Sequence, residues 1–163
     1  MNALVLFRSY HGNTEQVAEA IARRLRETGH MAVVQDLRRA LPELGSFDLV
    51  AIGAPTRMAR VTHSALGVLR RLRRKGFTAK PIVVFDTYGP VPTDPQAAEK
   101  SRPWIYPGAA GMLQKAAAGL GLNVYAEVLR CQVKGLKGPL ADGELERALS
   151  FTDAFASALG GER

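Results

Sequence analysis

Short apolar runs alternate with longer amphipathic segments along most of the chain. The runs are short enough for buried strands, and they predict five of them, at residues 4–7, 31–35, 49–52, 82–85 and 123–129. Apolar residues at helical spacing predict four helices, at residues 14–28, 62–75, 109–120 and 144–159. Strands that alternate with helices indicate an α/β protein, with a doubly wound parallel sheet between two helical layers.

The remaining segments are expected to be irregular. Residues 36–45 are polar and predict a loop with at most a short helix, and residues 133–143 are rich in glycine and predict a turn. The proline-rich segment 87–107 holds the only tryptophan, Trp104, and predicts a long irregular loop that is either functional or mobile. Residues 160–163 are expected to fray. At 163 residues, the chain is expected to form a single domain, residues 1–163.

The loop between the first strand and the first helix has the chemistry of a phosphate site. It consists of Ser9, Tyr10, His11, Gly12, Asn13 and Thr14. Backbone N–H groups at a helix N-terminus favour an anion, and glycine lets the backbone turn tightly beside it. The P-loop pattern G-x-x-x-x-G-K-[ST] and the dinucleotide pattern G-x-G-x-x-G are both absent. An ordinary helix start with Asn13 or Thr14 as the N-cap is the alternative.

This loop resembles the FMN phosphate loop of flavodoxins, commonly [ST]-x-[ST]-G-x-T, although His11 replaces the usual hydroxyl residue. The resemblance implies a flavodoxin-like sheet of strand order 2-1-3-4-5 with FMN as the cofactor. Ligands in such sheets bind at the carboxyl ends of the strands, at the topological switch point. That rule selects the loops after the first, third and fourth strands.

The other two selected loops extend the resemblance. After the third strand, Pro55, Thr56, Arg57, Met58 and Ala59 are similar to the loop of flavodoxin-like proteins that packs against the flavin ring. Met58 corresponds to a methionine over the ring, and Ala59 replaces a glycine found in many flavodoxins, whose peptide flips on reduction. After the fourth strand, Thr87, Tyr88 and Gly89 correspond to a loop at the other side of the ring, with Tyr88 as the expected stacking residue and Trp104 as a second one. Taken singly, the Pro55–Thr56 segment is also typical of a plain turn, and Tyr88 of core packing.

Composition narrows the class of protein and its partners. The net charge of +7 favours an anionic partner, but no nucleic-acid-binding motif is present. The three histidines and Cys131 lack metal-ligand spacing, so no metal site is expected. One cysteine indicates a reducing, cytoplasmic location and is interpreted as a buried apolar residue. No apolar run is long enough for a membrane span. The basic run 70–75 is interpreted either as a solvated helix end or as a dock for an acidic partner.

The resulting hypothesis is an FMN-binding, flavodoxin-like redox protein that carries electrons between partner proteins, with acidic docking faces on those partners. In this hypothesis the protein has no catalytic acid, base or nucleophile. One alternative is an NAD(P)H-dependent quinone or flavin reductase, favoured by residues 55–57, with Arg57 or Arg60 at a cofactor phosphate. Another is a flavodoxin-like protoporphyrinogen oxidase, a family that Arg57 and residues 63–66 faintly resemble. A third is a flavodoxin-fold binding module without flavin, favoured by His11 and Ala59.

Overall fold

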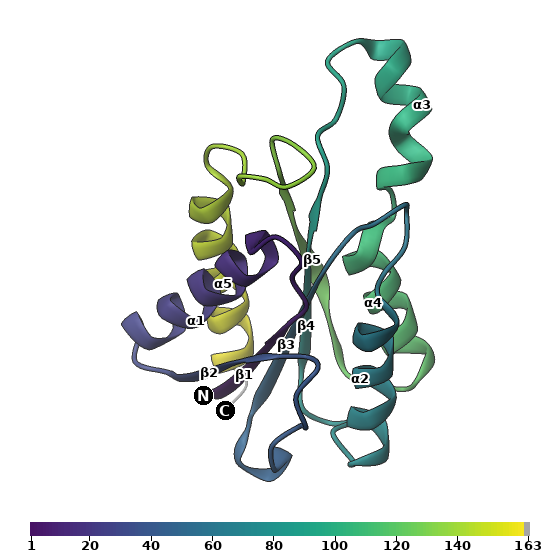
Figure 1. Ribbon diagram of the computed structural model, residues 1–163. Coiled ribbons are helices and arrows are strands. Elements are labelled where there is room, and N and C mark those ends of the chain that lie inside the picture. The colour runs from purple at the N-terminus through teal and green to yellow at the C-terminus, as the bar shows by residue number, and fades with distance from the viewer. Residues whose placement is uncertain (162–163) are drawn as a thin grey trace.

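The computed structural model describes residues 1–161, and a five-stranded sheet forms its centre (Figure 1). All neighbouring strands run parallel, in the order β2-β1-β3-β4-β5. The strands are β1 (Asn2–Phe7), β2 (Met31–Asp36), β3 (Leu49–Pro55), β4 (Ile82–Tyr88) and β5 (Val124–Gln132). The α/β class and the strand order 2-1-3-4-5 are therefore confirmed.

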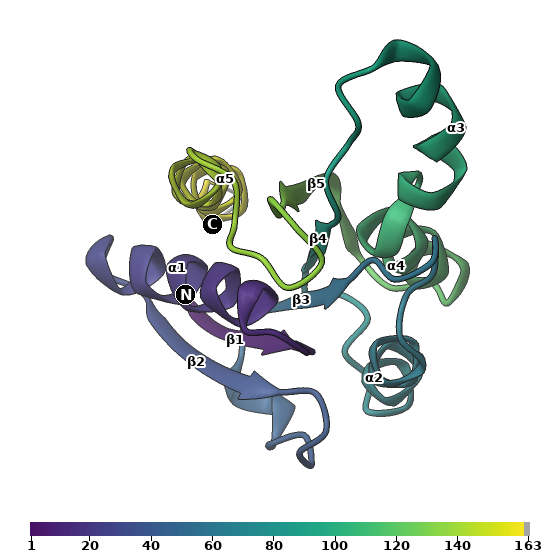
Figure 2. The same ribbon diagram turned by 45° about the horizontal axis from the view of Figure 1, so that its top comes forward.

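Helices cover both faces of this sheet, which gives the three layers expected (Figure 2). On one face lie α1 (Asn13–Glu27) and α5 (Glu144–Gly160), and on the other lie α2 (His63–Arg74) and α4 (Gly108–Gly119). The connection between β2 and β3 holds only a short 3-10 helix, η1 (Leu44–Ser46), in agreement with the predicted loop. Helix α5 continues through Gly160, so this residue does not fray, and residues 162–163 lie outside the described part of the chain.

The apolar runs are continuous because the central strands are buried on both faces. In β1, Leu4 and Leu6 pack in the core beneath α2 and α4, whereas Ala3 and Val5 pack in the core beneath α1 and α5. Successive side chains of a strand point to opposite faces, so a strand covered on both sides needs an apolar residue at every position. This pattern places the polar loops, and with them the pocket described below, at the ends of the strands.

The predicted strand ends were too early. Strands β4 and β5 continue to Tyr88 and Gln132, each three residues beyond the expected end. The first polar residue past each expected end is charged: Asp86 in β4 and Arg130 in β5. These two residues are directly opposite each other in the β4–β5 ladder and form an ion pair. Because the two opposite charges neutralise each other, both strands can continue through positions where a purely apolar pattern would predict the strand to end.

The expectation of an irregular segment over residues 87–107 was also wrong, because it contains the helix α3 (Pro95–Ile105). The side chain of Asp94 caps this helix and accepts a hydrogen bond of 2.8 Å from the N–H of Ala97. Pro95 occupies the first turn, where its missing N–H costs nothing, and Pro103 lies in the last turn. Helix α3 stands away from the sheet in both views (Figures 1 and 2).

Cys131 is a buried apolar residue, as interpreted from the sequence. Its side chain has no exposed surface and belongs to the core on the α1–α5 face. Burial raises the pKa of its thiol to about 12, chiefly because the thiolate would lose its hydration. A thiol with this pKa is almost entirely protonated at neutral pH, and only the thiolate is a good nucleophile.

We therefore expect Cys131 to react very slowly with a disulfide reagent such as Ellman's reagent in the native protein. In denaturant the same thiol should react at the rate of a free cysteine, because its pKa returns to the ordinary range. Absorbance of the released thiolate measures both rates. Rapid reaction without denaturant would show that Cys131 is accessible and would contradict its structural role.

Candidate functional site

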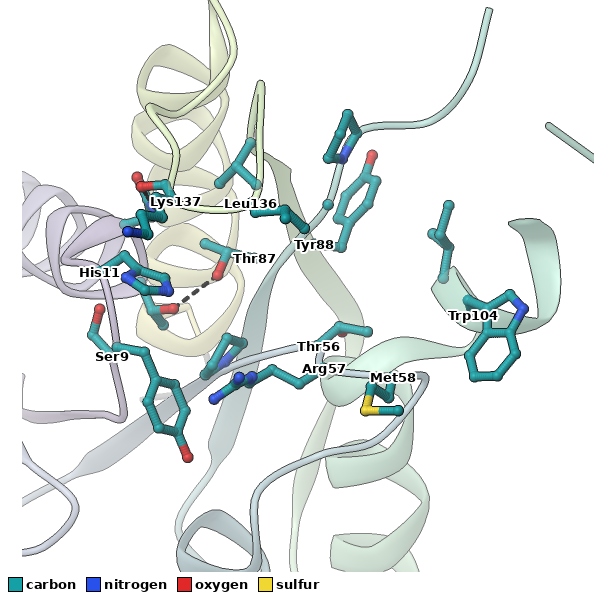
Figure 3. Close-up of a pocket in the computed structure, with 18 of the residues that line it drawn as sticks. Ser9, His11, Thr56, Arg57, Met58, Thr87, Tyr88, Trp104, Leu136 and Lys137 are labelled. Carbon is teal, nitrogen blue, oxygen red and sulfur yellow. Dashed lines mark hydrogen bonds between the residues drawn. The ribbon is translucent and has the colours of Figure 1, made fainter. Parts of the chain in front are cut away.

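A cavity of about 720 Å³ lies at the carboxyl ends of β1, β3 and β4 (Figure 3). The three predicted loops all contribute to it. Of the predicted site residues, all line the cavity except Gly12 and Ala59. The cavity also has walls that the sequence did not predict. Pro90 comes from the segment after β4, Ser101 and Ile105 come from α3 together with Trp104, and Val133, Leu136 and Lys137 come from the loop after β5.

The first loop is shaped by its glycine. Gly12 has φ +86 and is the N-cap residue of α1, and its N–H donates a 2.9 Å hydrogen bond to Oγ of Ser9. Neither Asn13 nor Thr14 caps the helix with its side chain, so the alternative of an ordinary capped helix start is not supported. The N–H groups of the first helical turn thus keep free donors at the cavity. This is the arrangement that favours binding of an anion.

Two hydrogen bonds connect this first loop to its neighbours. The hydroxyl groups of Thr14 and Thr87 lie 2.8 Å apart, and both residues are buried. This contact joins the first turn of α1 to the end of β4 (Figure 3). The amide of Asn13 donates a 3.1 Å hydrogen bond to the carbonyl oxygen of Lys137, which attaches the loop after β5. The phosphate-type loop is therefore braced from two sides.

The second loop ends in a tight turn. Arg57 and Arg60 exchange two backbone hydrogen bonds, of 3.0 and 2.8 Å, and enclose Met58 and Ala59. Both enclosed residues have positive φ, +47 for Met58 and +63 for Ala59, a region that is costly for residues with a Cβ. The turn leaves Met58 79% exposed at the mouth of the cavity. Ala59, the predicted site residue, instead lies outside the cavity lining.

We expect Ala59→Gly to stabilise the protein by about 0.5–1 kcal/mol. Glycine removes a backbone penalty of roughly 1–2 kcal/mol at positive φ, and part of this gain is offset by the greater entropy of glycine in the unfolded chain. Ala141→Gly is the matched control, because Ala141 lies in a loop but does not have positive φ. Urea unfolding of both variants measures the difference. If Ala59→Gly loses as much stability as Ala141→Gly, the backbone at Ala59 is not strained.

Arginine side chains flank the first two loops. The guanidinium groups of Arg8 and Arg57 lie 4.2 and 4.4 Å from the ring centre of Tyr10. Arg57 thus extends from its own loop toward the Ser9 side of the cavity (Figure 3). Lys137 adds a further cation, and no carboxylate lines the cavity among the described residues. The cavity therefore has a positive electrostatic character, which suits an anionic ligand.

The basic run at residues 70–75 does not belong to this site. It occupies the end of α2 that precedes β4, whereas the cavity lies at the carboxyl ends of the strands. The side chains of Arg73, Arg74 and Lys75 are exposed there. This placement favours the interpretation as a solvated helix end with cations near the C-terminal dipole. Residues 63–66, which suggested an oxidase, form the first turn of α2 and do not line the cavity.

Asp86 is a site residue that the sequence did not predict. Its carboxylate is fully buried and accepts hydrogen bonds from the Thr56 hydroxyl at 2.8 Å, the Ala110 N–H at 3.1 Å and Nε of Arg130 at 3.0 Å. Burial raises the pKa of this carboxyl, and the Arg130 guanidinium acts in the opposite direction. The Thr56 hydroxyl in turn accepts a 2.7 Å hydrogen bond from the N–H of Ala109. Asp86 thereby links the second loop to the N-terminus of α4.

The cavity combines polar donors with apolar walls. A phosphate group would meet free N–H donors, hydroxyl groups and cations at one end. A planar ring could contact both the Thr56–Met58 segment and Tyr88, because these residues line the same cavity. No group of three or more metal-ligating side chains occurs in the described part of the chain. The donors present fit a phosphorylated, planar, apolar ligand.

Comparison with known proteins agrees with this geometry. A family model described as a flavodoxin domain matches residues 4–109, which is more than half of the chain. The chain belongs to the flavodoxin family. No curated protein sequence matches the chain significantly. The family assignment covers the loops after β1, β3 and β4, which are the three loops that the sequence predicts as the cofactor site.

Solved structures of two flavodoxins and of a flavodiiron core have the same fold. A flavodoxin from the domain Archaea is 20% identical with a TM-score of 0.75, and the match covers 98% of this chain and 99% of that chain. Oxidised Flavodoxin 2 from Bacillus cereus is 20% identical with a TM-score of 0.73, covering 97% and 99%. A flavodiiron core from Synechocystis is 20% identical with a TM-score of 0.75, covering all of this chain but 37% of that protein. Within residues 1–161, no helix of this flavodoxin-family chain is long and apolar enough to cross a membrane.

Proposed function

We propose that this protein is a single-domain, FMN-binding redox protein of the cytoplasm that carries electrons between partner proteins. The observation that supports this proposal is the cavity at the switch point, where three flavodoxin-type loops converge on one space without a carboxylate in its lining. Bound FMN would supply the electron-transfer chemistry. The residues of the chain bind the cofactor, orient it and control its contact with water.

Each part of the cavity has a role in this proposal. The phosphate would accept hydrogen bonds from the loop that holds Ser9, His11, Gly12, Asn13 and Thr14. Pro55, Thr56, Arg57 and Met58 would hold one side of the ring, with Ala59 shaping the turn, and Thr87, Tyr88 and Gly89 would hold the other side. Trp104 and Ile105 of α3 would cover one end. The wild-type protein needs no catalytic acid or base for this role.

The test of this proposal is the identity and stoichiometry of the flavin in purified protein. After denaturation, mass spectrometry should identify the released cofactor as FMN, close to one per chain once the protein has been loaded with it. FAD in stoichiometric amount would contradict the proposal, because the cavity has one phosphate-type loop and the chain lacks an adenosine fingerprint. Protein that stays colourless after FMN addition would support a binding module without flavin.

A reductase is the second candidate, and α3 is the observation that favours it. The helix adds Ser101, Trp104 and Ile105 to the cavity wall and so encloses space beside the proposed ring position. A small-molecule acceptor could occupy that space. Sustained NADPH oxidation by the FMN-loaded protein in the presence of a quinone would identify a reductase. Without such turnover, the role of electron carrier is retained.

The proposed partners are acidic at their docking faces. Large apolar side chains stand exposed in the lining of the cavity, among them Met58 at 79%, Trp104 at 59% and Leu136 at 92%. Arg57 and Lys137 lie beside them in the lining. An apolar patch with cations at its rim fits a partner with an apolar patch and an acidic rim. Such attraction accelerates encounter and weakens as salt screens the charges.

We therefore expect reduced, FMN-loaded protein to transfer electrons faster to an acidic protein than to a basic one. Native cytochrome c is a basic probe, and its succinylated form offers the same haem with acidic charge. The rate with the succinylated form should fall severalfold as salt is added, whereas the rate with the native form should not fall. Stopped-flow absorbance at the haem band measures both. A faster reaction with the native form at low salt would contradict an acidic partner.

A further inference from the structure

Asp86 and Arg130 contact the cavity walls without lining the cavity. Asp86 accepts the hydroxyl hydrogen bond of Thr56, while Arg130 contacts Tyr88 and Ile105. Those three contacted residues line the cavity and come from three separate segments: the end of β3, the end of β4 and helix α3. The ion pair thus lies behind three walls at once. A pair placed in this way can set the distances between the walls.

Several contacts fix the orientation of the Arg130 guanidinium. Its Nε donates to both carboxylate oxygens of Asp86 at 3.0 and 3.1 Å, and its Nη2 donates to the carbonyl oxygen of Ile105 at 2.8 Å. The guanidinium also lies over two aromatic rings, 4.6 Å from the ring centre of Tyr88 and 5.0 Å from that of Tyr106. A planar guanidinium that is hydrogen-bonded at its edge and contacts two aromatic rings has little freedom to move.

One group of Arg130 is left without a partner. Nη1 is buried and makes no hydrogen bond to any described residue. A buried unsatisfied donor is destabilising, and such groups are rare in folded proteins. Stability of the fold alone does not account for a buried arginine with an unused donor. Apart from its ion pair with Asp86, the guanidinium contacts Tyr88 in the cavity wall and Ile105 and Tyr106 at the end of α3, and these contacts account for its position.

Helix α3 depends on this anchor. Of its residues, only Ile105 is buried, and helices shorter than about 12–15 residues are marginal in isolation. Packing therefore gives α3 little support along its length. Its last turn is attached where Nη2 of Arg130 binds the carbonyl oxygen of Ile105. Losing this hydrogen bond and the adjacent stack on Tyr106 should release the helix and, with it, Trp104.

We propose that Asp86 and Arg130 are positioning residues that hold Thr56, Tyr88 and α3 in the geometry that binds the cofactor. The proposal rests on the proposed function in taking FMN as the ligand of the cavity. It assigns no direct contact between the pair and the flavin. Loss of Arg130 should therefore loosen α3 in the ligand-free protein and weaken the binding of FMN to the molecules that remain folded.

The first experiment uses the protein without flavin. Arg130→Met removes the charge and the edge donors, and Arg130→Lys keeps the charge but not the planar fork. Arg24→Met is the control for losing an arginine ion pair away from α3, because Arg24 makes a two-bond but more exposed ion pair with Asp153, between α1 and α5 on the far side of the sheet. Hydrogen exchange of residues 95–105 and acrylamide quenching of Trp104 report on α3. Trp104 is the only tryptophan, so the fluorescence signal is specific.

We expect Arg130→Met to accelerate exchange in α3 at least tenfold and to increase quenching of Trp104. Arg130→Lys should show a smaller change, and Arg24→Met should match the wild type in both measurements. If Arg130→Met does not fold, Arg130→Lys takes its place and is compared with Arg24→Met in the same two measurements. Exchange and quenching equal to the wild type in the folded Arg130 variants would overturn the proposal.

The second experiment measures the FMN dissociation constant by flavin fluorescence, corrected for the folded fraction. Arg130→Met should bind at least tenfold more weakly than the wild type, and Arg24→Met should stay within twofold. A lower melting temperature with unchanged affinity would show a purely structural role and overturn the proposal. If the wild type itself does not bind FMN, the proposed function fails, whereas the exchange experiment still decides the role of the pair.

Discussion

Gly108→Ala is expected to lower the free energy of unfolding by about 3–5 kcal/mol, the cost of disrupting a buried ion pair. Gly108 has φ +72 and begins α4 directly against that pair. A Cβ at this position would overlap the guanidinium of Arg130 and lie 2.7 Å from Oδ2 of Asp86. The guanidinium cannot move aside without losing its hydrogen bond to Ile105 and its contacts with the rings of Tyr88 and Tyr106. Asp86 would then remain buried without its cation.

Gly76→Ala separates this effect from backbone strain. Gly76 has φ +75, almost the same as Gly108, but a Cβ there would meet no atom within 4 Å. The free energy of unfolding of Gly76→Ala should therefore fall only by the cost of alanine at positive φ, roughly 1–2 kcal/mol. Urea or thermal unfolding of the ligand-free proteins measures both changes. Equal losses in the two variants would mean that the Asp86–Arg130 pair adapts to the added methyl group at little cost.

Much of the fold could be predicted because its determinants are local. Runs such as 49–52 need no knowledge of their neighbours to indicate strands buried on both faces. The same holds for the loop that contains Gly12, whose position between a strand and a helix is visible in the sequence. The three predicted loops come together because the carboxyl ends of parallel strands share one edge of the sheet.

The Asp86–Arg130 pair could not be found in this way. The two residues are 44 positions apart, and each stands where an apolar pattern ends. Only the register of β4 against β5 places them opposite each other. Once the strand order is known, two opposite charges just past the ends of neighbouring apolar runs become a usable signal. Nothing local distinguishes either residue from an ordinary first residue of a loop.

Helix α3 was missed for a different reason. The prolines of segment 87–107 predict irregular structure, and they outweighed a local signal that was present. Asp94 followed by Pro95 is a typical helix start, with a capping side chain and a proline in the first turn. The walls contributed by Leu136 and Lys137 were missed because the loop after β5 lies beside the switch point rather than at it. Its attachment to Asn13 brings it to the cavity.

Thr14→Ala is expected to weaken FMN binding by about 1.5–3 kcal/mol, or roughly tenfold to 150-fold. Thr14 is buried in the first turn of α1, and its hydroxyl faces Thr87 at 2.8 Å at the floor of the proposed phosphate end. A hydroxyl donor to a charged phosphate contributes more than a neutral hydrogen bond, because the charge strengthens it. Alanine removes that donor and leaves the Thr87 hydroxyl without its partner.

Thr14→Ser is the matched control, since it keeps the hydroxyl group and removes only a methyl group. The affinity of Thr14→Ser for FMN should stay close to that of the wild type, whereas Thr14→Ala, which lacks the hydroxyl donor, should bind FMN more weakly. Flavin fluorescence titration measures the dissociation constants, and circular dichroism of the ligand-free proteins confirms that both variants are folded. Equal affinities for Thr14→Ala and the wild type would place the phosphate away from Thr14. Equal losses in both variants would assign the effect to packing of the methyl group rather than to the hydroxyl donor.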